Sequence, residues 1–293
     1  MSTLPANTPD SRKLPNLPLC EPLEERRMLS AKVVDGIIQV KATSGDDTIS
    51  ISRSGGTFTI TISTKVTPAI SPEVTSLSAH GVQAIRVRGL SGNDTIGVGG
   101  SFSTRLIIFG GDGNDTITGG AGADNLNGGA GDDSIGGGGK NDRISGGDGN
   151  DKLSGDAGND RINGDNGNDT INGGDGNDSL IGAAGNDSIH GDNGRDTIKG
   201  GNDLDSLFGD ADNDLLFGGN GNDSLDGGQD DDILNGGNDN DTIFDHNGSD
   251  VLRGNDGNDS LDSADGVRGD GLNGGTGTNT VTKDVTDFES NIV

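Results

Sequence analysis

Aromatic residues are almost absent from this chain of 293 residues, which contains no Trp, no Tyr and only seven Phe. Hydrophobic residues account for 27% of the sequence and aromatic residues for 2%. Because burial of apolar area is what offsets the entropy of ordering a chain, this composition does not predict ordinary packed domains. The scarcity of aromatics also counts against a sugar-binding site, since such sites favour aromatic stacking.

Cysteine and long hydrophobic runs are equally scarce. Cys20 is the single cysteine, which excludes an intrachain disulfide. No apolar stretch approaches the roughly 18 residues of a transmembrane helix, and the first 30 residues lack the apolar segment of a signal peptide. His80, His190, His246 and Cys20 are too scattered to form a zinc site.

Positive charge and glutamate are the remaining deficits. The chain has 20 Lys and Arg against 48 acidic residues, a formal charge of −28, which excludes nucleic acid and anionic membranes as expected partners. Five of the 48 acidic residues are Glu, so 43 are Asp. Low hydrophobicity with high charge is typical of disorder. Disordered acidic tracts usually favour Glu, however, and here Ile and Leu recur at regular spacing.

A nine-residue repeat occupies more than half of the chain. Residues 110–262 form 17 consecutive copies, of which Gly173-Gly174-Asp175-Gly176-Asn177-Asp178-Ser179-Leu180-Ile181 is a good example. Position 6 is Asp and position 8 is Ile or Leu in all 17 copies. Position 1 is Gly in every copy except the one that begins at Asp245, and position 4 is Gly in 12 copies.

These copies resemble the RTX, or hemolysin-type, calcium-binding repeat, Gly-Gly-x-Gly-x-Asp-x-U-x with U apolar. The resemblance implies an all-β fold, a right-handed parallel β-roll with Ca²⁺ between stacked loops, preceded by irregular β-coils. It also implies that two repeats form one coil, so that each repeat stacks on the second one after it.

The residue types agree with that chemistry. The x-U-x triplet forms a minimal strand with one side chain inward, and the six residues before it form a turn. Aspartate supplies a hard anionic oxygen and glycine lets carbonyl oxygens approach an ion, which suits the 6–8 oxygen ligands of Ca²⁺. An EF-hand is excluded, because its loop ends in Glu and residues 110–262 contain none.

The aspartates at position 6 are therefore the predicted calcium ligands. Pairing each with the one 18 residues later gives 17 − 2 = 15 pairs, hence at most about 15 ions. The run has 34 Asp and 7 Lys or Arg, and therefore a formal charge of −27. Fifteen Ca²⁺ ions carry a charge of +30, so full occupancy would nearly neutralise the run. Asp94, in a decayed repeat, is a further candidate beside the 17 of the array, which are Asp115, Asp124, Asp133, Asp142, Asp151, Asp160, Asp169, Asp178, Asp187, Asp196, Asp205, Asp214, Asp223, Asp232, Asp241, Asp250 and Asp259.

Four segments are expected along the chain. Residues 1–31 form a disordered leader, in which Leu23-Glu24-Glu25-Arg26-Arg27-Met28-Leu29 resembles the LEPR-XLL segment of predicted bacterial surface proteins and implies export. Residues 32–109 form a degenerate β-rich cap, in which Phe58, Ile60 and Ile62 alternate with polar residues. Residues 110–282 form the roll, and residues 283–293 form a C-terminal tail or cap.

One face of the roll is expected to carry an apolar row. Leu215, Ile233 and Val251 occupy position 7 of three alternate repeats near the C-terminal end of the array, and Phe217 lies at position 9 beside them. Stacked on consecutive coils, they would form a patch of roughly 300 Å², large enough to suggest a contact with the C-terminal tail or with a second copy of the chain. An ordinary solvated β-face remains the alternative.

No catalytic constellation is present in the sequence, so we expect no enzyme. The leading prediction is a secreted or cell-surface calcium-binding protein with a structural or matrix role, which folds when Ca²⁺ binds. The alternatives are an adhesion module for polysaccharide or a surface protein, and a member of an RTX toxin, hydrolase or epimerase family.

Overall fold

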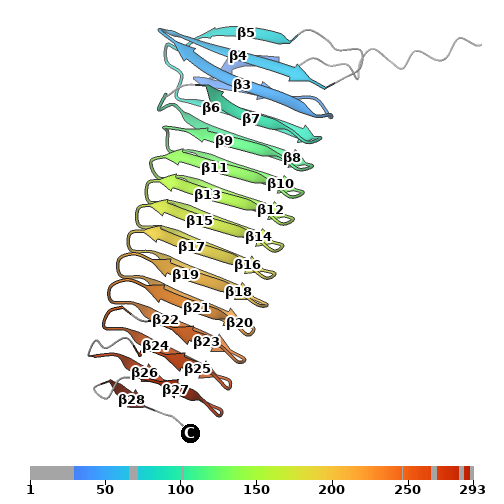
Figure 1. Cartoon of the computed structure of the whole chain (residues 1–293). Helices are drawn as coiled ribbons and strands as arrows, with labels where there is room; N and C mark the ends of the chain where they lie inside the picture. The colour runs from blue at the N-terminus through green and yellow to red at the C-terminus, as the bar shows by residue number, and fades with distance from the viewer. Residues whose placement is uncertain are drawn as a thin grey trace, which may run out of the picture.

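The computed structural model describes residues 30–65, 72–99, 102–245, 247–264, 269–283 and 287–290. These residues form 28 strands joined by turns, and the described residues contain no helix. The strands build two 14-stranded sheets that run the length of an elongated stack of coils (Figure 1). The all-β parallel solenoid expected from the repeats is confirmed. The LEPR-XLL-like segment lies outside the described residues.

The chain alternates between the two sheets. The first sheet holds, in spatial order, β1 (Ser30–Val34), β2 (Ile37–Lys41), β6 (Ala84–Ser91), β8 (Arg105–Asp112), β10 (Asn125–Ala130), β12 (Arg143–Asp148), β14 (Arg161–Asn166), β16 (Ser179–Ala184), β18 (Thr197–Asn202), β20 (Leu215–Asn220), β22 (Ile233–Asn238), β24 (Val251–Asp256), β26 (Gly271–Asn273) and β28 (Phe288–Ser290). The second sheet holds β5 (Glu73–Ser78), β4 (Thr57–Thr64), β3 (Asp47–Ser54), β7 (Thr95–Gly99), β9 (Thr116–Gly120), β11 (Ser134–Gly139), β13 (Lys152–Ala157), β15 (Thr170–Asp175), β17 (Ser188–Asn193), β19 (Ser206–Asp210), β21 (Ser224–Gly228), β23 (Thr242–Phe244), β25 (Ser260–Asp262) and β27 (Thr280–Thr282).

The register of the array equals two repeats. Ile171 of β15 pairs with Leu153 of β13 and with Ile189 of β17, each 18 residues away, and all three strands are parallel. Two nine-residue repeats therefore make one coil, as the resemblance implied. This register places the same position of the repeat at the same place on every coil, so each position forms a column along the stack.

The core is one column of aliphatic side chains from each sheet. Every Ile or Leu at position 8, from Ile117 to Leu261, is at most 3% exposed. Each repeat thus contributes one buried aliphatic side chain, while the backbone of nine residues must be ordered. Apolar burial alone does not stabilise the coil, and backbone and loop interactions must supply the difference.

The N-terminal end departs from the regular pattern. The strands β3, β4 and β5 form an antiparallel meander, and β1 pairs antiparallel with β2. Phe58, Ile60 and Ile62 of β4 are 1–3% exposed, as their alternation predicted, and the Phe58 ring meets Phe102 edge-on at 5.4 Å. This meander covers the first coil of the parallel stack (Figure 1).

Glycine is required in the loops for two different reasons. At position 4, Gly176 has φ +141°, in a region that other residues rarely adopt. At position 1, Gly173 does not have a positive φ. A Cβ there, however, would lie 2.5 Å from Asp178 Oδ2 and 2.6 Å from the carbonyl oxygen of Gly191. Position 1 is therefore glycine because the aspartate of its own repeat and the next coil occupy the space.

This crowding predicts a large difference between two Gly→Ala substitutions in the array. Gly173→Ala forces the ladder apart and should lower the free energy of unfolding by about 1–3 kcal/mol or more. At Gly139, by contrast, the nearest atom to an added Cβ is 3.7 Å away, and Gly139→Ala should be neutral or stabilise by up to about 1 kcal/mol. Thermal unfolding of both variants in saturating Ca²⁺ measures the difference, and equal stabilities would contradict the packing argument.

Candidate calcium-binding ladder

All 17 aspartates at position 6 are buried in the loops that lead into the strands. None of them is more than 4% exposed. In 16 of the 17 loops the amide of the residue after the aspartate donates to the previous coil, as where the Ser188 amide donates to the Asp169 carbonyl oxygen at 2.9 Å. The loop backbone thus holds each carboxylate inside the stack and away from water.

One oxygen of each carboxylate joins consecutive coils. Asp187 Oδ1 accepts a hydrogen bond from the Asp169 amide at 2.8 Å, and the Asp187 amide donates to Asp205 Oδ1 at 2.9 Å. The same contact, at 2.6–2.9 Å, occurs in all 15 pairs from Asp115/Asp133 to Asp241/Asp259. The structure therefore brings together the pairs that the sequence predicted, in two continuous ladders.

The second oxygen lacks a hydrogen-bond partner along most of both ladders. Among the described residues, Oδ2 is buried and without such a partner in Asp115, Asp133, Asp142, Asp151, Asp160, Asp169, Asp178, Asp187, Asp196, Asp205, Asp214, Asp223, Asp232, Asp241 and Asp259. In Asp124 the same atom accepts from the Gly120 amide at 2.9 Å. A buried anionic oxygen with no partner costs several kcal/mol. A column of such atoms, spaced by one coil, fits a row of hard cations.

Burial also changes the acidity of these groups. It raises the pKa of Asp142 and Asp205 to about 7 and that of Asp214 to about 8, against hydrogen bonds from the previous coil that lower it. Neighbouring carboxylates, such as Asp196 and Asp232 beside Asp214, raise the pKa further. A proton or a cation would therefore stabilise the buried carboxylates of Asp142, Asp205 and Asp214 at neutral pH.

The ladders extend beyond the regular repeats at both ends. The Asp94 amide donates to Asp115 Oδ1 at 2.7 Å and the Asp47 amide donates to Asp94 Oδ1 at 2.8 Å. Asp94 Oδ2 is buried and has no hydrogen-bond partner among the described residues, so Asp94 matches the array. In Asp47, Oδ2 is already bound by the Thr43 amide and hydroxyl, both at 2.8 Å.

At the C-terminal end, sequence reasoning missed two members of the ladders. The Asp250 amide donates to Asp270 Oδ1 at 3.0 Å, and the Asp259 amide donates to Asn279 Oδ1 at 2.8 Å. Both partners lie 20 residues away instead of 18. The signal was present, since Asp270-Gly271-Leu272 keeps the Asp-x-U spacing after a two-residue insertion.

Asp245 is a further residue whose placement the sequence did not reveal. In the sequence it stands out only as the single exception to glycine at position 1 of the 17 repeats. In the structure it is fully buried next to Asp232 and Asp250 of the ladder.

The predicted apolar row is aligned by the sheet register. Leu215 pairs with Ile233 and Ile233 with Val251 on consecutive strands of the first sheet. Ile233 is 39% exposed, and Lys199 Nζ lies 5.9 Å from the centre of the Phe217 ring. The last described residues do not cover this row, because β28 pairs with β26 as the edge strand of the same sheet.

Comparison with known families agrees with this geometry. A family model described as RTX calcium-binding nonapeptide repeat (4 copies) matches the chain over residues 107–135, 136–171, 163–198, 172–207, 199–234, 208–243 and 235–267. Together these matches cover residues 107–267 without a break. Comparison with curated proteins gives no match. In the part of the chain that the structure describes, no helix is long and apolar enough to span a membrane.

Proposed function

Since the chain belongs to the RTX calcium-binding nonapeptide-repeat family, we propose that it is an extracellular or cell-surface protein whose roll folds when Ca²⁺ binds, and that its role is structural and not enzymatic. The observation that carries this proposal is the column of buried, unpartnered Oδ2 atoms. Those atoms would be strongly destabilising in a roll that had neither a cation nor a proton to neutralise them.

The position-6 aspartates and the carbonyl oxygens of their loops would hold the ions. Mixed carboxylate and carbonyl ligation suits Ca²⁺, and its 6–8 ligands can be shared between two coils. A bound ion supplies positive charge between carboxylates that otherwise repel each other. The chain itself supplies the frame, because the amide-to-Oδ1 bonds keep one oxygen of each carboxylate fixed, so that the other would be left to ligate an ion.

Coupling of folding to binding follows from the core. One buried aliphatic residue per repeat does not offset the entropy of nine ordered residues, so the ions supply free energy that the apolar contacts do not. Extracellular calcium modules bind with Kd of about 10⁻⁴–10⁻³ M. A chain with such sites would stay unfolded in a calcium-poor cytosol and fold after export, which supports the extracellular assignment.

A second function, adhesion to a surface protein, is favoured by the row of Leu215, Ile233 and Val251 with Phe217 beside it. The row lies on the outer face of the first sheet, and Ile233 is exposed. Binding of the purified protein to immobilised cell-surface proteins, lost in Leu215→Lys plus Ile233→Lys, would establish adhesion through this row. If the doubly substituted protein bound these surface proteins as well as the wild type does, the row would not be the site of adhesion.

The primary test is far-UV circular dichroism of the metal-stripped protein at pH 7.5, titrated with Ca²⁺ and separately with Mg²⁺. We expect a cooperative change from coil to β-structure at submillimolar to millimolar Ca²⁺. Mg²⁺ should not produce it, because that ion requires a smaller and more nearly octahedral site. A metal-stripped protein that is already β-rich, and whose spectrum Ca²⁺ does not change, would contradict the proposed function.

A further inference from the structure

Asp245 breaks a rule that the rest of the array obeys. It stands at position 1, where the other 16 repeats have Gly. At Gly173 and at other position-1 glycines, the space of a side chain is filled by the aspartate of the same repeat and a carbonyl oxygen of the next coil. Above Gly227, that space is occupied by the Asp245 carboxylate together with Asp232 Oδ2.

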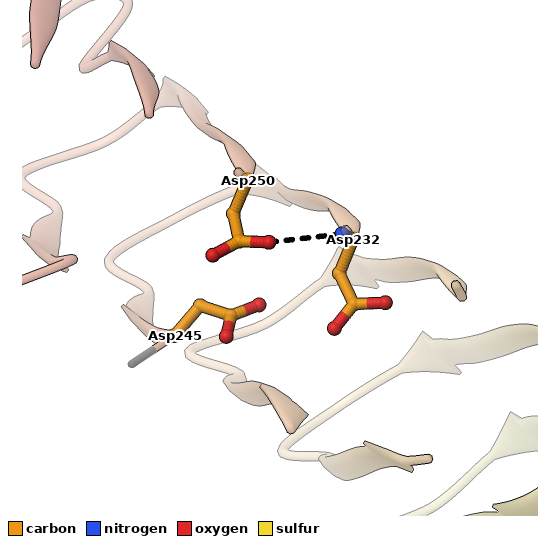
Figure 2. A group of neighbouring side chains, drawn as sticks. All are labelled: Asp232, Asp245 and Asp250. Carbon is orange, nitrogen blue, oxygen red and sulfur yellow. Dashed lines mark hydrogen bonds between the residues drawn. The ribbon is translucent and has the colours of Figure 1, made fainter. Parts of the chain in front are cut away.

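The Asp245 carboxylate therefore points into the ladder. Each of Asp232, Asp245 and Asp250 offers one carboxylate oxygen, and these three atoms lie within 4.8 Å of one another. Figure 2 shows the three carboxyl groups gathered in one place, with Asp250 bound to the Asp232 amide at 2.9 Å. Two oxygens that ligate the same Ca²⁺ can be up to about 5.2 Å apart, twice the longer Ca–O distance, so one ion can contact all three.

Two of the three oxygens need a ligand. Asp245 is 0% exposed and Asp232 is 1% exposed, and Oδ2 of each is buried without a hydrogen-bond partner among the described residues. Two carboxylates cannot hydrogen-bond to each other unless one of them holds a proton. A cation between the two carboxylates would neutralise both buried oxygens.

We infer that Asp232, Asp245 and Asp250 form a three-carboxylate cation site that binds a hard cation more tightly than the two-carboxylate sites of the regular array, and that prefers trivalent to divalent ions. This inference rests on the proposed calcium-binding function and adds one residue and one unit of charge to a single position in the ladder. Compared with a regular pair of ladder aspartates, this site carries one additional carboxylate that belongs to it alone. A more negative set of ligands favours an ion of higher charge, so a trivalent lanthanide of similar size should be preferred to Ca²⁺ here.

The test uses the full chain loaded with about 1 mM Ca²⁺ and titrated with Eu³⁺, whose luminescence is excited directly because the protein has no Trp or Tyr to sensitise it. The wild type should show one Eu³⁺ equivalent that binds roughly tenfold or more tightly than the rest, since the charge of the ligands sets affinity. Asp245→Gly, which restores the residue of the other 16 repeats, should abolish this first phase and leave the weaker ones unchanged.

The matched control is Asp230→Gly. It removes the same charge from the same region and likewise restores a repeat glycine, but Asp230 is exposed and lies outside the cluster. It should keep the tight phase. Asp245→Asn provides a second variant of nearly unchanged shape, for use if circular dichroism in Ca²⁺ shows that Asp245→Gly does not fold.

The possible results separate the two ideas. Equal Eu³⁺ affinity in the wild type, Asp245→Gly and Asp245→Asn would overturn the inference, and would mean that Asp245 holds a proton shared with Asp232. That result would leave the proposed function intact if all three proteins still fold with Ca²⁺. Failure of the wild type to fold with Ca²⁺ would instead contradict the proposed function itself.

Discussion

The calcium-free protein should gain β-structure when the pH is lowered from about 8 to about 5, so that protons replace calcium in stabilising the roll. Sixteen of the 17 position-6 aspartates have a raised pKa in the folded state, and burial is the largest cause in each. In the unfolded chain an aspartate titrates near 3.9. The folded chain therefore binds more protons than the unfolded chain throughout the range between these values.

The sign of the effect follows from linkage. A group whose pKa is raised on folding contributes stability that is fully present below its unfolded pKa, near 4, and that is lost as the pH rises through its folded pKa. For Asp142, Asp205 and Asp214 that loss occurs around pH 7–8. Each additional proton bound by the folded state changes stability by about 1.4 kcal/mol per pH unit, so several aspartates acting together produce a steep dependence.

The measurement is far-UV circular dichroism of metal-stripped protein between pH 4 and pH 9, with thermal unfolding at each pH. The calcium-loaded protein is the control, and its spectrum should stay β-rich from about pH 6 to pH 8, because the ions neutralise the same carboxylates. A calcium-free protein that loses β-structure on acidification would show that the aspartates are ionised in the apo roll, contrary to the pKa shifts that burial causes.

The regular part of the fold could be predicted from the sequence because it depends on spacing. Asp at position 6 and an aliphatic residue at position 8, repeated every nine residues, specify which side chain is buried and which oxygen lies in the loop. In the repeat that contains Asp187, the core residue was therefore predictable as Ile189. The partner of Asp187 was predictable as Asp205 because the RTX resemblance implies that two repeats form one coil, and each coil contacts only its neighbours.

The parts that sequence reasoning missed are those where the spacing changes or where packing decides. Asp270 was not predicted as a member of the ladder because a two-residue insertion shifts it out of the nine-residue phase. Asp245 stayed in phase, but a carboxylate at position 1 has no place in the repeat pattern, and only the neighbouring coil shows that it points at Asp232. The role of Asn279 as an acceptor for the Asp259 amide likewise depends on a contact between coils.

A ladder aspartate has two roles: it accepts a hydrogen bond from an amide of the previous coil, and it provides negative charge for an ion. The bond from the Asp259 amide to Asn279 shows that an uncharged side chain can keep the first role, so substitutions of Asp187 can measure the two separately. Asp187→Ala removes the acceptor for the Asp169 amide and a ligand from both sites that Asp187 shares, with Asp169 and with Asp205. Asp187→Asn should retain the acceptor, as Asn279 does at the end of the ladder, and lose the negative charge. Both variants should therefore bind about two ions fewer than the wild type.

The two variants should differ in stability. Asp187→Ala leaves a buried amide without an acceptor, which costs about 1–3 kcal/mol beyond the loss of the ions, whereas Asp187→Asn avoids that cost. Asp203→Asn, which removes the same charge from an exposed side chain two residues before Asp205, is the matched control.

Calcium content after equilibrium dialysis and the Ca²⁺ midpoint of the folding transition distinguish the roles. We expect the midpoint to rise in both Asp187 variants, more in Asp187→Ala, and to stay near the wild-type value in Asp203→Asn. An Asp187→Asn protein with the calcium content and midpoint of the wild type would show that the Asp187 charge does not hold an ion. If Asp187→Ala and Asp187→Asn were equally stable, the bond from the Asp169 amide would contribute nothing, and the ladder would be held by its ions alone.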